Sequence, residues 1–295
     1  MMGAEVRGRG EDCLPPLTIR GARLRPIRYQ PSPPSAQVKS ALLLAGLHAE
    51  GRTTVLEPVA TRDHTERMLR LFGVEVETEG AEVAVRGPAH LSAAAVTVPG
   101  DISSAAFFFV AAAILPGSRL TVRDVGVNPS RTGLLEVLSE MGAEVTIENQ
   151  RQTASEPVAD VTVASRGRLR GVAIGGQMVP RLVDEIPVLA VAAAVAEGRT
   201  TVRDAPQLRH KESDRLQAVA SQLGALGARI QPTEDGLVVD GVERLRGGKC
   251  RSLGDHRIAM SCAIAGLAAS GAVEIADTDC IATSFPGFEA VLSSL

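Results

Sequence analysis

Four segments of the chain share one pattern, in which an apolar, alanine-rich helix is followed by a glycine and then by a strand that ends in an acidic residue. The segments begin at Ser40, Ser104, Pro187 and Arg257. Their glycines, where a helix C-cap is expected, are Gly51, Gly117, Gly198 and Gly271. A unit repeated in this way buries its faces against its neighbours, so the repeat constrains the fold more than any single motif.

A second, shorter helix follows each apolar one, with apolar residues at helical spacing. These second helices are expected at residues 65–72, 133–141, 213–226 and 286–295. Strands that begin GVEVETEG, GAEVTIENQ and GARIQPTEDGLVVDG come next, and the last contains a hairpin turn at Asp235 and Gly236. The unit is therefore β-α-β-α-β-β, and its repetition predicts an α/β fold built from such units.

The start of the chain resembles the middle of a unit. The run MGAEV at Met2 recurs at Met141, where it joins a second helix to its strands. Either a preceding helix is missing from this polypeptide or the start is an irregular cap, and we favour missing sequence ahead of Met1. The run VPGD at residues 98–101 is the best interior boundary, which predicts a partial first lobe over residues 1–99 and a nearly complete second lobe over 100–295.

Charge and hydropathy exclude several classes of protein. The chain has 31 Lys plus Arg against 34 Asp plus Glu, a balance that argues against a nucleic-acid-binding surface. Its longest apolar stretch, residues 105–115, is too short for a membrane helix, and its start lacks the apolar core of a signal peptide. Its four cysteines have no metal-site spacing; they are Cys13, Cys250, Cys262 and Cys280. We expect a cytoplasmic protein that binds neither nucleic acid nor membrane.

Polar side chains gather where the apolar helices begin. Ser35 and Gln37 stand before the first of them, where free N-H groups suit phosphate or carboxylate, although an N-cap serine explains Ser35 better. Asp184 and Glu185 precede the third, where capping and a proton acceptor with a shifted pKa are equally good explanations.

Two second helices also begin with charged runs. In residues 61–66, capping by Asp63 or Thr65 is the favoured explanation, and His64 is expected to be a hydrogen-bonded structural residue. Residues 209–215 form the densest charge run, in which Lys211 and Arg215 are four residues apart and so are expected to share a helix face. A solvated, salt-bridged first turn is one explanation of this run. Two cations at a helix start oppose its dipole, however, and an anion-binding site would explain that cost.

Arg257 stands at the start of the fourth apolar helix, so equivalent edges of the units would bring together arginines, a lysine and carboxylates. This combination suits a phosphoryl- or carboxylate-bearing substrate and proton transfer. The sequence contains no hydrolase elbow, phosphate-binding Walker loop, dinucleotide fingerprint or metal triad.

Eight runs of the sequence together resemble a known family. They are SAQVKSALLLAG, TRDHTERML, PGDISSAAFF, NPSRTGLLEVL, DEIPVLAVAAA, KESDR, GDHRIAM and TSFPGF. In register from Met2 to Leu295, they are similar to the enolpyruvyl transferases, and among these to the 5-enolpyruvylshikimate-3-phosphate (EPSP) synthases. The resemblance implies an inside-out α/β fold of two lobes built from βαβαββ units. It also implies transfer of the enolpyruvyl group of phosphoenolpyruvate to the 5-hydroxyl of shikimate 3-phosphate, without a metal or organic cofactor.

The resemblance also implies roles for individual residues. It makes Asp184 the proton acceptor and Glu212 the residue that assists proton transfer at the methylene carbon. The residues implied to contact shikimate 3-phosphate are Ser35, Ala36, Gln37 and Lys211. Those implied to contact phosphoenolpyruvate are Gln37, Arg215 and Arg257.

Two alternatives stay open beside this hypothesis. One is an enolpyruvyl transferase that acts on a nucleotide sugar, which the KESDR and GDHRIAM runs fit less well. The other is a catalytically incompetent remnant of the fold. Because part of the family's cationic residues has no counterpart here, we expect little turnover from this polypeptide alone, and we expect a monomer for a full-length chain.

Overall fold

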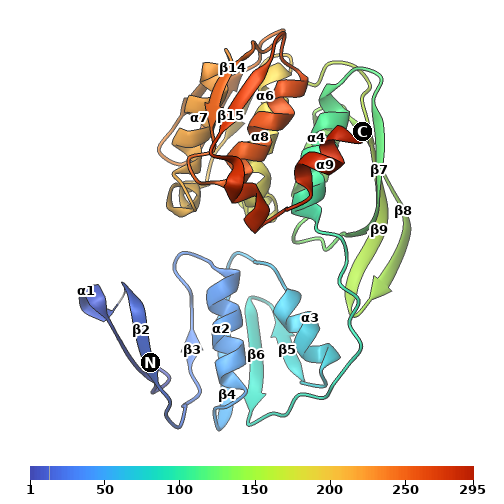
Figure 1. Cartoon of the computed structure of the whole chain (residues 1–295). Coiled ribbons are helices and arrows are strands. Elements are labelled where there is room, and N and C mark those ends of the chain that lie inside the picture. Colours follow the sequence, from blue (N-terminus) through green and yellow to red (C-terminus); the bar gives the residue numbers. More distant parts are fainter. Residues whose placement is uncertain (13) are drawn as a thin grey trace. The chain divides into compact units, whose positions relative to one another are not determined.

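A computed structural model describes residues 1–12 and 14–295 of the chain. Cys13, one of the four cysteines, lies outside the described residues. The chain divides into two compact units (Figure 1). Unit 1 comprises Met1–Val98 together with Thr153–Glu156, and unit 2 comprises Pro99–Gln152 and Pro157–Leu295.

Unit 1 begins with a hairpin. Strands β1 (Glu5–Gly8) and β2 (Leu14–Arg20) pair antiparallel, and the turn α1 (Arg9–Asp12) between them has left-handed backbone at Gly10 and Glu11. The hairpin is the strand pair expected from the MGAEV run.

The rest of unit 1 forms one β-α-β-α-β-β repeat. Its strands are β3 (Arg28–Tyr29), β4 (Gly51–Leu56), β5 (Val76–Glu79) and β6 (Glu82–Gly87). Its helices are α2 (Ala36–Gly46) and α3 (His64–Leu71). The sheet order is β3-β4-β6-β5, with β3 parallel to β4 and the other pairs antiparallel. Val55 of β4, Val76 of β5 and the alternate residues Val83 and Val85 of β6 pack with leucines of the helices in a small core.

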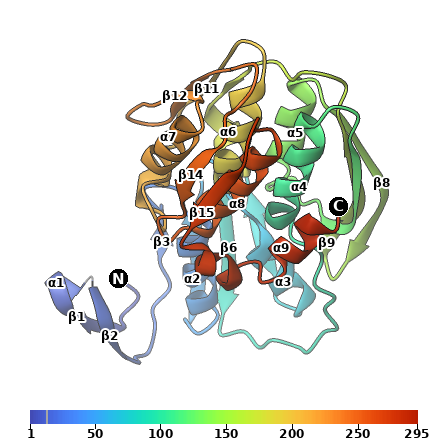
Figure 2. The same cartoon turned by 45° about the horizontal axis from the view of Figure 1, so that its top comes forward.

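Unit 2 continues the repeat around three inner helices, α4 (Ile102–Ile114), α6 (Ile186–Val195) and α8 (His256–Leu267), which contact one another. Nearly all residues of α4 and α6 and most residues of α8 are buried, and Figure 2 shows the three helices at the centre of the unit with strands toward its outside. A helix that is apolar on every side needs neighbours all round, so these sequences can fold only as interior helices.

The outer elements of unit 2 complete three further repeats. The first contains β7 (Arg119–Gly126), α5 (Gly133–Glu140), β8 (Glu144–Thr153) and β9 (Glu156–Ala164). The second contains β10 (Ala173–Ile174), β11 (Arg199–Val202), α7 (Arg215–Ala225), β12 (Arg229–Pro232) and β13 (Leu237–Asp240). The third contains β14 (Gly248–Arg251), β15 (Val273–Ala276) and α9 (Phe288–Ser293). Four 3₁₀ helices join them: η1 (Gly176–Arg181), η2 (Val183–Glu185), η3 (Pro206–His210) and η4 (Thr278–Thr283).

The sheets repeat one topology. The order β10-β11-β13-β12 matches β3-β4-β6-β5, and in the three-stranded sheet β7-β9-β8 a parallel bridge between Gly100 and Val125 stands where the first strand would be. The fourth repeat is represented by the parallel pair β14-β15. The prediction of an α/β fold of βαβαββ units is confirmed.

One local expectation was wrong. The inner helices end three or more residues before the expected C-cap glycines, for example α4 at Ile114 and α6 at Val195. Gly117 and Gly198 instead lie in the turn into the next strand, with φ of 75° and 88°. The left-handed backbone explains why glycine recurs there, but it serves the turn and does not cap the helix.

The C-terminal helix α9 is held by aromatic packing. Phe288 is buried, and its ring lies 5.9 Å from that of Phe107 and 5.7 Å from that of Phe108, both in α4. Such edge and tilted contacts stabilise beyond the apolar area that they bury. No helix in the described part of the chain is long and apolar enough to cross a membrane.

Candidate active site

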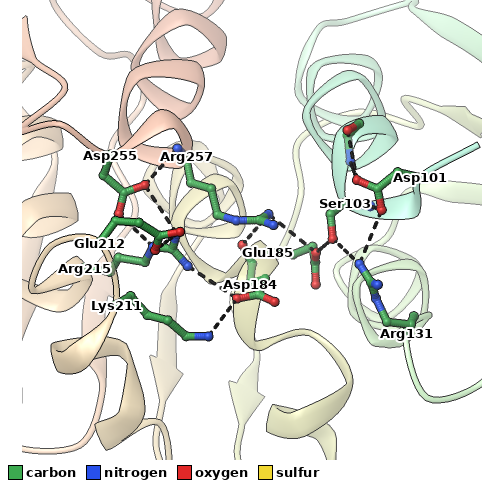
Figure 3. A network of polar contacts seen from close by, with 11 residues as sticks. Asp101, Ser103, Arg131, Asp184, Glu185, Lys211, Glu212, Arg215, Asp255 and Arg257 are labelled. Atoms are coloured by element: carbon green, nitrogen blue, oxygen red, sulfur yellow. Dashed lines mark hydrogen bonds and ion pairs between the residues drawn. The ribbon is translucent and has the colours of Figure 1, made fainter. Parts of the chain in front are cut away.

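The charged candidates of unit 2 come from the starts of its helices. Asp184 lies in η2 directly before α6, Lys211 and Glu212 follow η3, Arg215 is the first residue of α7, and Arg257 is the second of α8. Because α6 packs against both α7 and α8, their starts meet, and Figure 3 shows the five side chains in one network.

Arg215 is the centre of this network and is only 1% exposed. Its Nε donates to Asp255 Oδ2 at 2.8 Å, its Nη2 to Glu212 Oε2 at 2.6 Å and its Nη1 to Asp184 Oδ1 at 3.3 Å. Three carboxylates therefore share one buried guanidinium, which fixes their relative positions.

Asp184 lies between two cations. Its Oδ1 is 3.3 Å from Lys211 Nζ and 3.3 Å from Arg215 Nη1. The expectation that Lys211 and Arg215 share a helix face was wrong, because α7 begins only at Arg215 and Lys211 has extended backbone. The two cations meet at the same carboxylate oxygen by tertiary folding.

Asp255 is buried and was not predicted as a site residue. Its Oδ1 caps α8 by accepting from the main-chain N of Arg257 at 2.9 Å, and its Oδ2 accepts from Ser213 Oγ at 3.0 Å. Burial acts to raise the pKa of Asp255, but the hydrogen bond and charge of Arg215 outweigh it and hold that pKa below its usual value. The signal available in the sequence was the N-cap position of Asp255 in the GDHRIAM run.

Arg257 differs from Arg215 in its surroundings. Its side chain is 15% exposed, and its Nη1 donates to the main-chain O of Asp184 at 3.0 Å. Its ion-pair partner is the carboxyl of Glu185, whose Oε1 lies 3.8 Å from Arg257 Nη1, beyond hydrogen-bonding distance. The charge of Arg257 is therefore much less offset than that of Arg215.

Glu185 extends the network to α4. Its Oε1 accepts a hydrogen bond from Ser103 Oγ, which itself accepts from Arg131 Nη2 at 2.5 Å. Arg131 Nη2 also lies 3.4 Å from Asp101 Oδ1 (Figure 3). Glu185 stands at the N-cap position of α6 but makes no side-chain capping hydrogen bond, so capping does not explain Glu185. Ser103 and Arg131 lie in the PGDISSAAFF and NPSRTGLLEVL runs but were not singled out.

Ser35, Ala36 and Gln37 belong to unit 1, where they form the start of α2. Ser35 Oγ accepts from the main-chain N of Val38 at 3.3 Å, so its N-cap role is confirmed. Ala36 and Gln37 are the first two helical residues. The structure brings these three together at one helix start, whereas the other candidates belong to unit 2.

The run at 61–66 does not cap α3. Asp63 makes no capping hydrogen bond and accepts from Arg67 Nε at 2.8 Å, while the Thr65 hydroxyl meets Ser40 Oγ at 2.6 Å. His64 Nδ1 is 2.7 Å from Glu156 Oε1, a hydrogen-bonded position such as the sequence suggested. Asp63 is therefore used for an ion pair within the first turns of α3, and Thr65 for a contact with α2.

Among the described residues, no group of three or more His, Cys, Asp or Glu side chains could hold a metal ion. Two surface hollows, of about 560 and 310 Å³, are lined by no residue of the charged network. The first lies beside Arg229 and the second beside His64. The candidate site is therefore defined by its charges and not by an apolar cavity.

Comparison with known proteins points to one family. The family model of EPSP synthase (3-phosphoshikimate 1-carboxyvinyltransferase) matches residues 1–292. The 3-phosphoshikimate 1-carboxyvinyltransferase of Desulforudis audaxviator is 56% identical over 294 residues, which are 100% of this chain and 68% of the relative. The protein of that name from Geobacter sulfurreducens is 54% identical with the same coverage.

Solved structures agree with the sequence comparison. An EPSP synthase from Acinetobacter baumannii superposes with a TM-score of 0.89 at 46% identity, over 99% of this chain and 68% of that one. The enolpyruvyl transferase NikO from Streptomyces tendae gives a TM-score of 0.77 at 22% identity, over 100% of this chain and 68% of that one. The second likeness shows the fold alone.

Proposed function

The chain belongs to the EPSP synthase family of transferases, and from that premise we propose that it transfers the enolpyruvyl group of phosphoenolpyruvate to the 5-hydroxyl of shikimate 3-phosphate. The products are 5-enolpyruvylshikimate 3-phosphate and inorganic phosphate. The observation that carries the proposal is the network around Arg215, in which cations and carboxylates from three helix starts are fixed within hydrogen-bonding distance.

The reaction requires a proton to be added to one carbon and another to be removed from a hydroxyl. Protonation of the methylene carbon of phosphoenolpyruvate creates positive character on the adjacent carbon, which the 5-hydroxyl attacks as it loses its proton. The tetrahedral intermediate then loses a proton from the new methyl group and expels phosphate, which restores the double bond. Two carboxylates held by cations suit these exchanges.

We assign the proton from the 5-hydroxyl to Asp184 and the proton exchange at the methylene carbon to Glu212. Lys211, beside Asp184, would bind shikimate 3-phosphate, since its ammonium places positive charge where the acceptor hydroxyl must lie. Arg215 and Arg257 would bind phosphoenolpyruvate. In unit 1, Ser35, Ala36 and Gln37 would contact shikimate 3-phosphate, with Gln37 also near phosphoenolpyruvate.

The pairing of Arg215 makes its role more specific. Its guanidinium is buried, whereas the carboxyl of Glu212 that it holds is 48% exposed. An anion that reaches Arg215 would therefore replace Glu212 more easily than buried Asp255. Substrate binding would then release the Glu212 carboxylate next to the methylene carbon, where the proton is exchanged.

The two units would correspond to the two lobes of this fold, divided near residue 99, in a monomeric cytoplasmic enzyme. The KESDR and GDHRIAM runs favour shikimate 3-phosphate over a nucleotide sugar as the acceptor. Both acceptors are tested in the assay below.

The test measures phosphate release with phosphoenolpyruvate and each acceptor. Since the chain covers 68% of the length of its relatives, the assay uses both the 295-residue chain and a fusion to the unmatched remainder of the Desulforudis audaxviator relative. Asp184→Asn should reduce turnover by about 100- to 10,000-fold while substrate binding persists. Asp240→Asn, which removes an exposed partner of Arg199, is the matched control and should leave turnover unchanged.

Phosphate release that depends on shikimate 3-phosphate supports the proposal. Release with a nucleotide sugar instead would assign the chain to the other acceptor, and no release from either form would leave the remnant as the correct interpretation. Equal turnover of Asp184→Asn and the parent protein would remove Asp184 from the mechanism.

A further inference from the structure

Glu185 departs from a rule that the other inner helices obey. The residue before α2, α4 and α8 caps its helix by a side-chain hydrogen bond; these residues are Ser35, Asp101 and Asp255. Glu185 occupies the same place before α6 but makes no capping bond. Its side chain is only 1% exposed, so a buried carboxyl has been placed at the site without a local structural use.

The side chain instead lies between two other helices. Its Oε1 accepts from Ser103 Oγ of α4 and is 3.8 Å from Arg257 Nη1 of α8. The same Nη1 donates to the main-chain O of Asp184, the residue next to Glu185 (Figure 3). Glu185 therefore lies next to the main-chain oxygen of Asp184, which accepts the hydrogen bond of the Arg257 guanidinium.

The surroundings favour an uncharged carboxyl. Oε2 of Glu185 is buried and has no hydrogen-bond partner among the described residues. Burying an unpartnered anionic oxygen costs far more than burying a neutral one. Burial raises the pKa of Glu185 and the nearby Asp184 charge acts in the same direction, against the Ser103 hydrogen bond and the charges of Arg257 and Arg131.

An uncharged Glu185 also preserves the charge that an anion needs. A carboxylate 3.8 Å from Arg257 would offset part of its positive charge and would repel phosphoenolpyruvate. Arg215 shows the opposite arrangement, since three carboxylates already neutralise it. A neutral Glu185 leaves the charge of Arg257 available to an anion without the displacement of a carboxylate that Arg215 requires.

We propose that Glu185 is a positioning residue, an uncharged carboxyl that is anchored by the Ser103 hydroxyl and packs beside the Arg257 guanidinium, keeping it against the Asp184 main-chain oxygen without neutralising it. The proposal rests on the proposed function, because it assigns Arg257 to phosphoenolpyruvate. It predicts that the shape and hydrogen bonding of Glu185 matter, and that its capacity to ionise does not.

The first test compares Glu185→Gln with Glu185→Ala in the form of the protein that binds phosphoenolpyruvate, by calorimetric titration with each substrate. Glu185→Gln keeps the Ser103 hydrogen bond and should bind phosphoenolpyruvate within about twofold of the parent protein. Glu185→Ala should bind it about tenfold more weakly, with shikimate 3-phosphate affinity little changed. Glu136→Gln, which alters an exposed partner of Arg181, is the matched control.

Three results would overturn the proposal. Equal losses in Glu185→Gln and Glu185→Ala would show that the charge is needed. Unchanged binding in Glu185→Ala would show that nothing is positioned. Equal weakening of both substrates by Glu185→Ala, with a lower melting temperature, would show a purely structural role.

Two further readouts do not depend on substrate. A carboxyl whose pKa is raised on folding costs stability increasingly as pH rises from about 4, the unfolded value. Glu185→Gln should therefore melt at or above the parent temperature at pH 8, with the difference closing toward pH 4. Phenylglyoxal should modify Arg257 several-fold faster in Glu185→Ala than in the parent protein, with exposed Arg199 as the internal reference.

These readouts separate the two proposals. If the parent protein binds no phosphoenolpyruvate, the proposed function fails while the melting and modification results still judge Glu185. A lower melting temperature of Glu185→Gln at every pH, or equal modification of Arg257 in all variants, would overturn the positioning role.

Discussion

Lys39 is a fully buried lysine in a small core, and its removal should destabilise unit 1 alone. Its side chain is 0% exposed, and Nζ lies 2.8 Å from Glu57 Oε2 and 2.6 Å from Glu66 Oε1. The ion pairs join α2 to the end of β4 and the first turn of α3. Lys39→Met keeps most of the side-chain volume but leaves two buried carboxylates without their cation.

The expected cost follows from that geometry. Removing one partner of a buried ion pair costs about 3–5 kcal/mol, because the remaining charge stays buried. Here two carboxylates remain, so the upper part of that range applies. A domain of ordinary stability has about 5–15 kcal/mol in total, so unit 1 should lose a large share of its free energy of unfolding.

Hydrogen exchange measured by mass spectrometry distinguishes the units. At about 1.4 kcal/mol per tenfold change, peptides from α2 and β4 should exchange roughly 700- to 4,000-fold faster in Lys39→Met, while α6 peptides are unchanged. Lys249→Met, which breaks an exposed pair with Glu274, should change nothing. Adding Glu57→Gln and Glu66→Gln to Lys39→Met should restore most of the protection.

Two results would contradict this prediction. One is that α2 and β4 peptides exchange at the same rate in Lys39→Met as in Lys249→Met, and the other is that neutralising both glutamates does not restore their protection. The first result would mean that the buried pairs contribute no more than surface pairs. The second would mean that the lost packing of the lysine stem, and not the unpaired charge, sets the cost.

Two further predictions concern unit 2. Arg215→Ala should lower its free energy of unfolding in urea by about 3–5 kcal/mol, because it strands buried Asp255, whereas Arg257→Ala should cost under about 1 kcal/mol; equal costs would contradict the contrast between the two arginines. Because the pKa of Asp255 is held below its usual value, its contribution to stability is present above about pH 4 and is lost as pH falls through the lowered value. Asp255→Asn should therefore be less stable than the parent protein at pH 7 and should show a flatter loss of melting temperature in acid; parallel melting curves would contradict this.

The repeat explains what the sequence could predict. Apolar helices that recur between strands must pack against one another, so residues at their starts must come close together. Asp184, Lys211, Glu212, Arg215 and Arg257 meet for that reason, although their spacing along the chain is irregular. Fold and general location were therefore predictable from periodicity before any resemblance was considered.

Individual partners were not predictable, because they depend on tertiary contacts. Ser103 and Glu185 are 82 residues apart, and no local pattern relates them. Asp255 caps α8, but its role as the partner of Arg215 follows only from the packing of α7 against α8. The prediction that Lys211 lies on a helix was wrong for the same reason, because local spacing could not show that α7 begins four residues later.

The position of Lys39 within its repeat shows why its charge must be paired internally. The residue four places after each helix cap points into the core, and in the other inner helices it is Ala105, Leu189 or Ala259, all buried. A lysine at this place cannot reach solvent, so the protein supplies Glu57 and Glu66. Lys39 is therefore a structural residue, although its type suggests a ligand-binding one.

The position two residues after the cap holds a polar residue in most of these helices. That position holds Gln37 in α2, Ser103 in α4 and Arg257 in α8, each close enough to the helix start to reach a ligand or another helix. In α6 it is Pro187, which carries no polar group, and the polar side chain moves back to the cap position as Glu185. α6 therefore lacks both a side-chain cap and a polar residue two places after it. The missing cap is a local cost that the fold alone does not require. We therefore place Glu185 in the chemistry of the site.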